Sequence, residues 1–176
     1  MLEIILGIIV VFSLFLIIVV LYNNKFLFSI IKIEKAEEDI EIYLDKKHEL
    51  LKRTIPIIKK EVKLEEFLDE IDKNFENENN FMIHNTLKTA YNELFKVLDE
   101  NEKLLKSDTL VNILEDLNNN EENITGSIKF YNDTVVEFNQ LIVSFPSNII
   151  AFFKRYKKKE FYNNEKREIF EILNNK

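Results

Sequence analysis

The fold of this chain is decided by residues 128–151, IKFYNDTVVEFNQLIVSFPSNIIA. Apolar residues recur there at steps of three and four, which places them on one face of a helix; they are Ile128, Tyr131, Val135, Phe138, Ile142 and Phe145. Pro146 disfavours helical geometry at Phe145, and Ser147 or Asn148 can cap a new helix that starts at Ile149. The stretch therefore predicts a long packed helix, a corner and a short helix.

The composition of the 176 residues favours an all-α protein. Two glycines and two prolines leave few helix breakers, and 31% charged with 46% hydrophobic residues suit long amphipathic helices. The net charge of -7 argues against nucleic acid as a partner, because a phosphate-binding surface needs a basic stripe. The chain has no cysteine, which excludes disulfides and zinc–thiolate sites.

Residues 4–22, IILGIIVVFSLFLIIVVLY, carry no charge and approach the roughly twenty residues needed to cross a bilayer. A cleaved signal peptide would need a basic start and a shorter apolar part, and a buried core helix is seldom apolar on all sides. We therefore expect a single-pass anchor in the cell membrane. Lys25, Lys32 and Lys35 follow the span, whereas Glu3 is the only charged side chain before it. This bias favours a cytoplasmic C-terminal domain over an exported one.

Helical spacing continues after the span and predicts a helix from about Phe26 to Phe75, kinked near Lys52 by Pro56. A loop at residues 76–80 should lead to a second helix from about Phe81 to Lys106. The third helix should start at Ser107 or Asp108 as N-cap and could bend at residues 118–120 and at Gly126. A short fourth helix from Asn148 to about Tyr162 should follow Pro146.

The expected architecture is thus an all-α fold with an N-terminal transmembrane helix and an antiparallel bundle of three long helices plus a short fourth. Its parts are a membrane anchor (residues 1–25), a helical bundle domain (26–162) and a C-terminal tail (163–176). If the helices alternate in direction, the corner at Pro146 lies far from the membrane.

A family resemblance rests on residues around this corner. Tyr131, Asn132, Asp133 and Asn139, together with Phe145, Pro146, Ser147 and Asn148, resemble the LemA family of bacterial membrane-anchored helical proteins. Residues 22–23 and 40–42 resemble its first helix, while Glu37, Lys52 and Ile128 depart from its pattern, as in a divergent member. The resemblance implies a helical fold and a membrane anchor, and it supplies no biochemical activity.

Two features could form a recognition site. Asn132 and Asn139 lie seven residues apart on one helix face, where their amides could fix helix register or dock a partner peptide. The second feature is a basic surface of Lys154, Arg155, Lys157, Lys158 and Lys159, flanked by aromatic residues. It could contact anionic lipid. With a distal corner it would instead face a protein partner or an opposed surface, or be a solvated end whose aromatics cap the core.

We expect no catalytic residue, cofactor or metal site. The two histidines, His48 and His84, form at most one carboxylate pair of di-iron spacing, Asp45 with His48. Phosphate-binding loops and nucleophile motifs are absent from the sequence. The predicted function is a non-enzymatic protein-interaction or scaffold module, with a ligand-responsive signalling protein as the alternative. Its predicted partners are the lipid bilayer, through the N-terminal helix, and an unknown protein, with further copies of the chain as an alternative.

Overall fold

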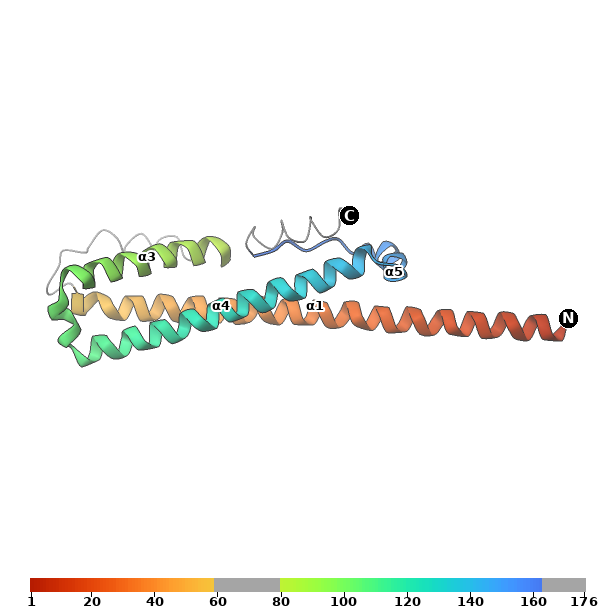
Figure 1. Ribbon diagram of the computed structural model, residues 1–176, viewed down its shortest axis with the longest axis horizontal. Coiled ribbons are helices and arrows are strands. Elements are labelled where there is room, and N and C mark those ends of the chain that lie inside the picture. The colour runs from red at the N-terminus through yellow and green to blue at the C-terminus, as the bar shows by residue number, and fades with distance from the viewer. Residues whose placement is uncertain (59–79, 163–176) are drawn as a thin grey trace. The chain divides into compact units, whose positions relative to one another are not determined.

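The computed structural model describes residues 1–58 and 80–162, and every regular element in these ranges is a helix (Figure 1). The elements are α1 (Leu2–Ile58), α3 (Asn80–Glu100), the 3-10 helix η1 (Glu102–Lys106), α4 (Asp108–Val143) and α5 (Ser147–Lys154). The all-α fold with an N-terminal apolar helix is confirmed. The loop expected near residues 76–80 and the tail at 163–176 lie almost wholly outside the described residues.

Helix α1 contains both the apolar span and residues 26–58 of the first helix expected after it, while residues 59–75 of that expected helix lie outside the described residues. It runs without a break from Leu2 to Ile58, with Pro56 near its end. Its most apolar part has a mean hydropathy of 3.5, and none of that part is buried against the rest of the protein. In the described ranges, α1 is the one straight helix that is long and apolar enough to cross a membrane.

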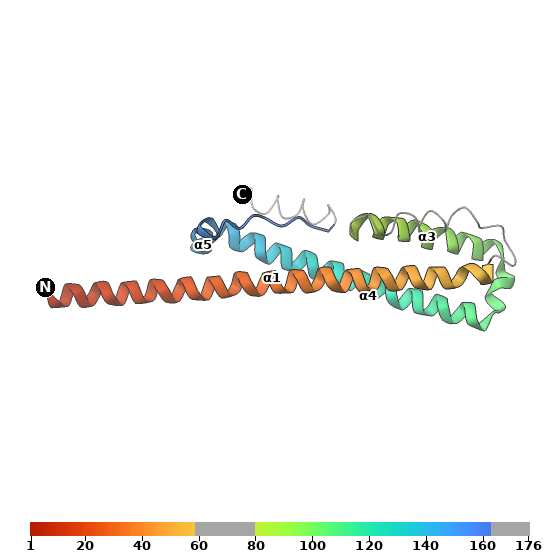
Figure 2. The ribbon, with the colours of Figure 1, turned by 180° about the vertical axis from the view of Figure 1, so that it is seen from behind.

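The described residues form two compact units, and α1 and α4 each contribute to both. The first unit contains residues 1–36 and 129–162, and the second contains residues 37–58 and 80–128. The second unit packs α1, α3 and α4 side by side (Figures 1 and 2). Its buried apolar side chains include Leu44, Leu51, Leu87, Leu94, Leu98, Leu110, Leu117 and Ile124.

The direction of α3 corrects the expected topology. In the second unit α3 runs in the same direction as α1, and α4 is the helix that runs the opposite way (Figure 1). An apolar stripe determines which face of a helix is buried but does not determine the direction in which the helix runs. The expected alternation of directions therefore fails at α3.

The connection from α3 to α4 is tighter than expected, because the second long helix ends at Glu100 rather than at Lys106. Asn101 leaves helical geometry with φ -134°, and its Nδ2 donates to the carbonyl oxygen of Val97 at 3.1 Å. The single turn η1 follows. Ser107 then accepts a hydrogen bond from the Leu110 N–H at its Oγ (3.4 Å), as an N-cap does. This expected cap is confirmed, and α4 continues unbroken through residues 118–120 and Gly126.

The first unit is centred on three aromatic rings. Phe26 of α1 packs against Phe138 of α4 at 5.8 Å between ring centroids and against Tyr156 at 4.9 Å. Phe138 and Tyr156 are 6.0 Å apart. These contacts fix the C-terminal part of α4 beside the part of α1 that directly follows the span.

The corner at Pro146 lies beside this same part of α1, which corrects the expectation that it is distal. Ser144 and Ser147 line one groove together with Tyr22, Lys25 and Ser29. Because α4 runs back toward the apolar span in this unit, its C-terminal end reaches the first residues after the span. The corner was expected far from the membrane because the second long helix was expected to run opposite to the first, whereas α3 runs in the same direction as α1.

Helix α5 also differs from expectation at both ends. It starts at Ser147 with Pro146 as the N-cap residue, and no side chain caps it. Ser147 is the first helical residue rather than the N-cap, and its hydroxyl donates to the Ser144 carbonyl oxygen at 2.8 Å. The helix ends at Arg155, whose φ of 56° is left-handed, and residues 157–161 form no regular element. The fourth helix is therefore shorter than the expected range to Tyr162.

Candidate functional site

Residues 159–162 are held against α4 by what we call the amide clamp, formed by Tyr131, Asn132 and Asn139. Asn139 makes two hydrogen bonds with the Lys159 backbone, donating from Nδ2 at 2.9 Å and accepting at Oδ1 at 2.8 Å. Asn132 Oδ1 accepts from the Tyr162 N–H at 2.8 Å. The Tyr131 hydroxyl donates to the Glu160 carbonyl oxygen at 3.0 Å. The two asparagines are buried, and their amides face the chain's own returning segment.

The amide clamp supplies hydrogen bonds to a backbone segment that has no helix or sheet partner of its own. Such groups are costly when left unpaired in a buried place, so the clamp stabilises the position of residues 159–162. The Tyr162 ring also packs on Tyr131, with centroids 6.2 Å apart, and burial raises the pKa of the Tyr162 hydroxyl. The remaining motif residues lie elsewhere: Asp133, Phe145 and Asn148 are exposed, Pro146 is half-buried, and Ser147 is buried.

The predicted basic surface is exposed along its whole length. Lys154 ends α5, Arg155 follows it, and Lys157, Lys158 and Lys159 lie on the segment that returns along α4. Tyr156, which lies between Arg155 and Lys157, instead packs its ring against Phe26 in the core. Phe152 and Phe153, by contrast, are 79% and 77% exposed. The interpretation in which the aromatic residues of this end cap the bundle core therefore fails for Phe152 and Phe153, whereas the Tyr156 ring does pack there.

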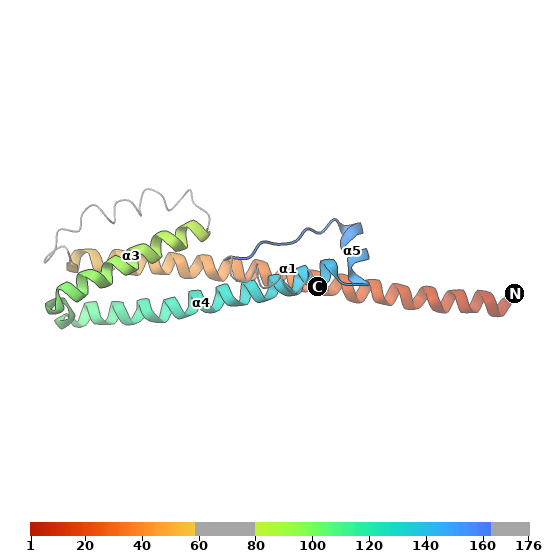
Figure 3. The ribbon, with the colours of Figure 1, turned by 45° about the horizontal axis from the view of Figure 1, so that its top comes forward.

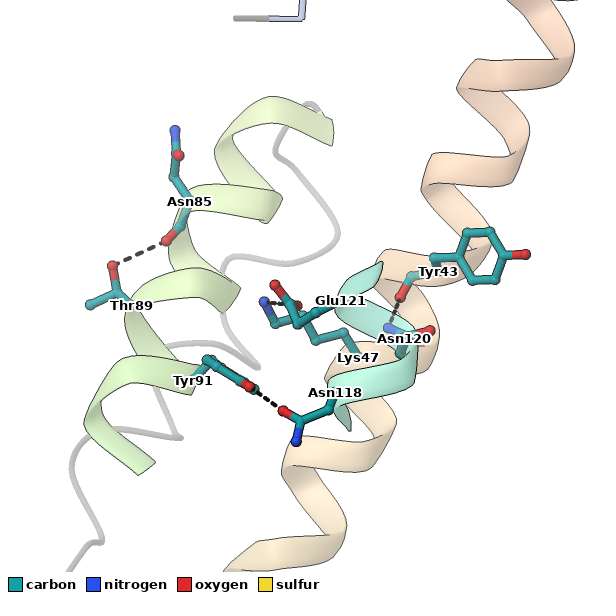
Figure 4. Close-up of polar contacts among 8 residues, drawn as sticks. All are labelled: Tyr43, Lys47, Asn85, Thr89, Tyr91, Asn118, Asn120 and Glu121. Carbon is teal, nitrogen blue, oxygen red and sulfur yellow. Dashed lines mark hydrogen bonds and ion pairs between the residues drawn. The ribbon is translucent and has the colours of Figure 1, made fainter. Parts of the chain in front are cut away.

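A polar cluster that sequence reasoning did not identify lies in the second unit, between α1, α3 and α4 (Figure 4). Its centre is an ion pair between Lys47 of α1 and Glu121 of α4. The Lys47 side chain is 0% exposed, whereas that of Glu121 is 27% exposed. The Lys47 ammonium also lies 5.0 Å from the centroid of the Tyr91 ring.

The other members of this cluster tie α4 to both of its neighbours. The Tyr91 hydroxyl of α3 donates to Asn118 Oδ1 at 2.6 Å, and Asn120 Nδ2 donates to the Tyr43 carbonyl oxygen of α1 at 2.8 Å. Figure 4 shows these two contacts on either side of the Lys47–Glu121 pair. The run of asparagines in α4, expected as a possible bend, thus supplies cross-helix hydrogen bonds.

Burial governs the electrostatics of this cluster. Desolvation lowers the pKa of Lys47, and the hydrogen bond and charge of Glu121 act in the opposite direction. Desolvation also lowers the pKa of His84, an effect to which the positive charge of Lys47 adds. Burial and the Glu121 carboxylate raise the pKa of Tyr91. A buried lysine held by a single carboxylate is costly in isolation, so the ion pair by itself is weak evidence for added stability.

One sequence signal for this cluster was present. Lys47 interrupts the apolar stripe of α1 at a position where the spacing expects an apolar residue. The sequence did not identify Glu121 as its partner. Glu121 is one of 31 acidic residues, and it lies on another helix, so no spacing along the chain links it to Lys47. Among residues 1–58 and 80–162, no group of three or more His, Asp or Glu side chains could hold a metal ion.

Comparison with known proteins identifies the family. The family model for LemA matches residues 36–172, which is most of the chain and begins after the apolar span. No curated protein matches the chain. The matched range contains both the amide clamp and the basic surface.

Proposed function

The chain belongs to the LemA family, and from that premise we propose that it is a single-pass membrane-anchored helical module that binds other proteins and catalyses no reaction. The observation that carries the proposal is the continuity of α1, from the apolar span at residues 4–22 to Ile58. A domain joined to its anchor by a helix, without a flexible linker between them, is suited to keeping a binding surface near a membrane.

The polar groups of the second unit support a non-catalytic function. Lys47 is engaged by Glu121, Tyr91 by Asn118, and the Asn120 amide by the backbone of α1. Side chains that serve as helix-to-helix contacts are committed to structure and are not presented to a substrate. The cluster therefore supports a scaffold more than a reaction centre.

We propose the cell membrane as the location and the cytoplasm as the side on which the bundle lies. Lys25, Lys32 and Lys35 on the C-terminal side of the span support this orientation. Because the chain has no cysteine, single-cysteine variants can test it. Glu122→Cys, at an exposed position of α4, should react with a membrane-impermeant maleimide only after the cells are lysed. Leu2→Cys should react in intact cells, and the reverse pattern would mean an exported bundle.

The binding function is tested by proximity labelling in intact cells. A labelling enzyme is fused after Lys176, and the matched control carries the same enzyme after residues 1–25 alone. The scaffold proposal expects a defined set of proteins that the full chain labels and the anchor control does not. If the two label the same membrane background, the proposal fails. Labelling of other copies of the chain above the control would indicate self-assembly.

A ligand-responsive signalling function is the second candidate, and the groove at the end of the span favours it. The groove is lined by Tyr22, Lys25, Ser29, Glu137, Gln140 and Ser144, among others, which gives it both charged and aromatic walls. A small molecule bound there should raise the melting temperature of the full chain in detergent micelles. It should not stabilise a Gln140→Trp variant whose groove is filled. Equal stabilisation of both proteins would argue against this candidate.

A further inference from the structure

We infer that α5 is a second membrane contact, lying in the headgroup region of the same bilayer that α1 crosses and binding anionic lipid through the basic surface. The inference rests on the membrane anchor proposed above and extends it to a part of the chain more than a hundred residues away. Four observations carry it: the level of α5 along α1, its direction, its exposed side chains and the charges that follow it.

The level of α5 is set by its neighbours on α1. Ser147, the first residue of α5, lines the groove together with Tyr22 and Ser29. The charge-free span ends at Tyr22, and Ser29 lies about 10 Å further along the helix at 1.5 Å per residue. The headgroup region adds roughly 5 to 8 Å to each side of the hydrocarbon core. When residues 4–22 cross the bilayer, α5 therefore starts level with the lipid headgroups.

The direction of α5 is that of a helix lying in the membrane plane. It is turned by 94° from α4. In this unit α4 packs along α1, where Phe138 contacts Phe26 and Glu137 lies 3.8 Å from the Lys32 ammonium. Helix α5 consequently runs across the axis of α1, as Figure 3 shows. With α1 along the bilayer normal, α5 is parallel to the bilayer surface.

The exposed side of α5 carries large apolar side chains between Asn148 and Lys154, although the opposite side of the helix is already buried. Ile150 and Ala151 face the protein, while Phe152 and Phe153 point outward, and Phe145 before the helix is 80% exposed. A helix that is apolar on both sides requires an apolar environment beyond its own domain. A bilayer interface provides it, because aromatic rings are favoured at the headgroup level.

The part of α1 at the same level has the character of an interface as well. Leu27, Phe28 and Ile31 are exposed, and the Lys25 and Lys32 ammonium groups lie over the rings of Tyr22 and Phe28. Aromatic rings beside lysines whose ammonium groups reach toward water are typical of the end of a membrane-spanning helix. Exposed apolar residues on α1 and on α5 thus occur at one level.

The basic surface gives the contact its lipid preference. Lys154, Arg155, Lys157, Lys158 and Lys159 follow the exposed phenylalanines directly, and all five are exposed. Positive side chains next to apolar residues inserted in the interface bind anionic headgroups, and this attraction weakens with salt. These five positive charges stand close together in a chain whose net charge is -7, so any attraction to anionic lipid is confined to this surface.

The experiment uses tryptophan reporters, because the chain contains no tryptophan. Phe152→Trp and Phe153→Trp are made in the full chain and reconstituted into vesicles of phosphatidylcholine with phosphatidylglycerol. Phe130→Trp is the matched control, since Phe130 is an exposed phenylalanine about 20 Å back along α4. Phe15→Trp reports the span. Lipids brominated on their acyl chains quench only rings that reach the apolar region.

We expect strong quenching of Phe15→Trp, clear quenching with a blue-shifted emission for Phe152→Trp and Phe153→Trp, and no quenching of Phe130→Trp. Phe15→Trp without quenching overturns the anchor and this inference together. Quenched Phe15→Trp with unquenched Phe152→Trp and Phe153→Trp overturns the inference alone. A blue shift at these positions without quenching would place α5 against a protein or another copy of the chain, which also overturns it.

A separate variant tests the preference for anionic lipid. Lys157→Gln, Lys158→Gln and Lys159→Gln are combined in the Phe152→Trp chain, whose aromatic residues are otherwise unchanged. Quenching should be stronger with phosphatidylglycerol than in phosphatidylcholine alone, and the triple variant should lose most of that difference. If the difference is absent from the parent chain, or persists in the triple variant, the assignment of anionic lipid to this surface is wrong.

Discussion

The side-chain amide of Asn139 pairs with the backbone of Lys159 through both of its polar atoms, at 2.9 and 2.8 Å. The amide thereby does for the Lys159 backbone what a neighbouring strand would do, although the partner is a helix. Asn139 and Lys159 are twenty positions apart, and the Phe145–Pro146 corner and α5 lie between them. The pair therefore closes the loop that contains α5.

Replacing Asn139 should loosen this closure. We expect Asn139→Ala to lower the free energy of unfolding by about 1–3 kcal/mol, because the Lys159 backbone groups lose their partners. Hydrogen exchange at the Lys159 amide should accelerate in the same variant. Asn148→Ala, at an exposed asparagine, should change stability by about 0.5 kcal/mol or less. The measurements are thermal unfolding of the full chain in micelles and amide exchange followed by mass spectrometry.

Asn139→Asp separates the two hydrogen bonds. The carboxylate keeps an acceptor for the Lys159 N–H but has no donor for the Lys159 carbonyl oxygen. We therefore expect the Lys159 amide to stay protected from exchange while overall stability falls. If Asn139→Asp and Asn139→Ala lose protection equally, the amide does not pair with Lys159 as described.

A second prediction concerns the aromatic centre of the first unit. Phe138 is buried and contacts both Phe26 and Tyr156, so Phe138→Ala should cost about 3–5 kcal/mol through lost burial and a cavity. Phe130→Ala is the control, because Phe130 lies on the same helix and is 44% exposed. Its cost, measured by the same unfolding experiment, should be clearly smaller. Equal costs would mean that the three-ring cluster does not form the core of this unit.

The sequence predicted the helices of this fold better than their arrangement. Spacing of apolar residues sufficed for α4, and the length of the uncharged run sufficed for the N-terminal apolar helix, because both are local properties. The direction of α3 was predicted wrongly, because an apolar stripe shows which face of a helix is buried but not which helix packs on that face or in which direction it runs. The partners of Asn132 and Asn139 were equally inaccessible, because they are backbone groups, which carry no side-chain signature.

The polar cluster around Lys47 could be predicted only in part from the sequence. Lys47 was visible as a break in an apolar stripe, but a break alone does not distinguish a helix kink, an exposed turn or a buried charge. Only the packing of α4 against α1 identifies Glu121 as its partner. The basic surface was likewise found from its residues, whereas its place at the end of the span depended on the direction of α4.

The third prediction tests the Lys47–Glu121 pair. Glu121→Gln removes the carboxylate and leaves the fully buried ammonium group without an opposite charge, which should cost about 3 kcal/mol. Lys47→Met combined with Glu121→Gln should restore stability to within about 1 kcal/mol of the parent or exceed it, because the buried charge is then gone. Glu122→Gln, an exposed neighbour, is the control. A double variant less stable than Glu121→Gln alone would show that Lys47 is not destabilising by itself.

The last prediction is a pH dependence that comes from His84. Burial, together with the charge of Lys47, holds the pKa of His84 below the value of 6.5 that it has when unfolded. Between these two values the unfolded chain binds more protons than the folded chain, so the free energy of unfolding falls as the pH falls through 6.5. One such group gives a slope of at most about 1.4 kcal/mol per pH unit. His84→Gln should remove this slope in urea titrations at several pH values. Lys47→Met should make the slope shallower, because the nearby positive charge contributes to lowering the pKa of His84. An unchanged slope in His84→Gln would assign the pH dependence to other groups.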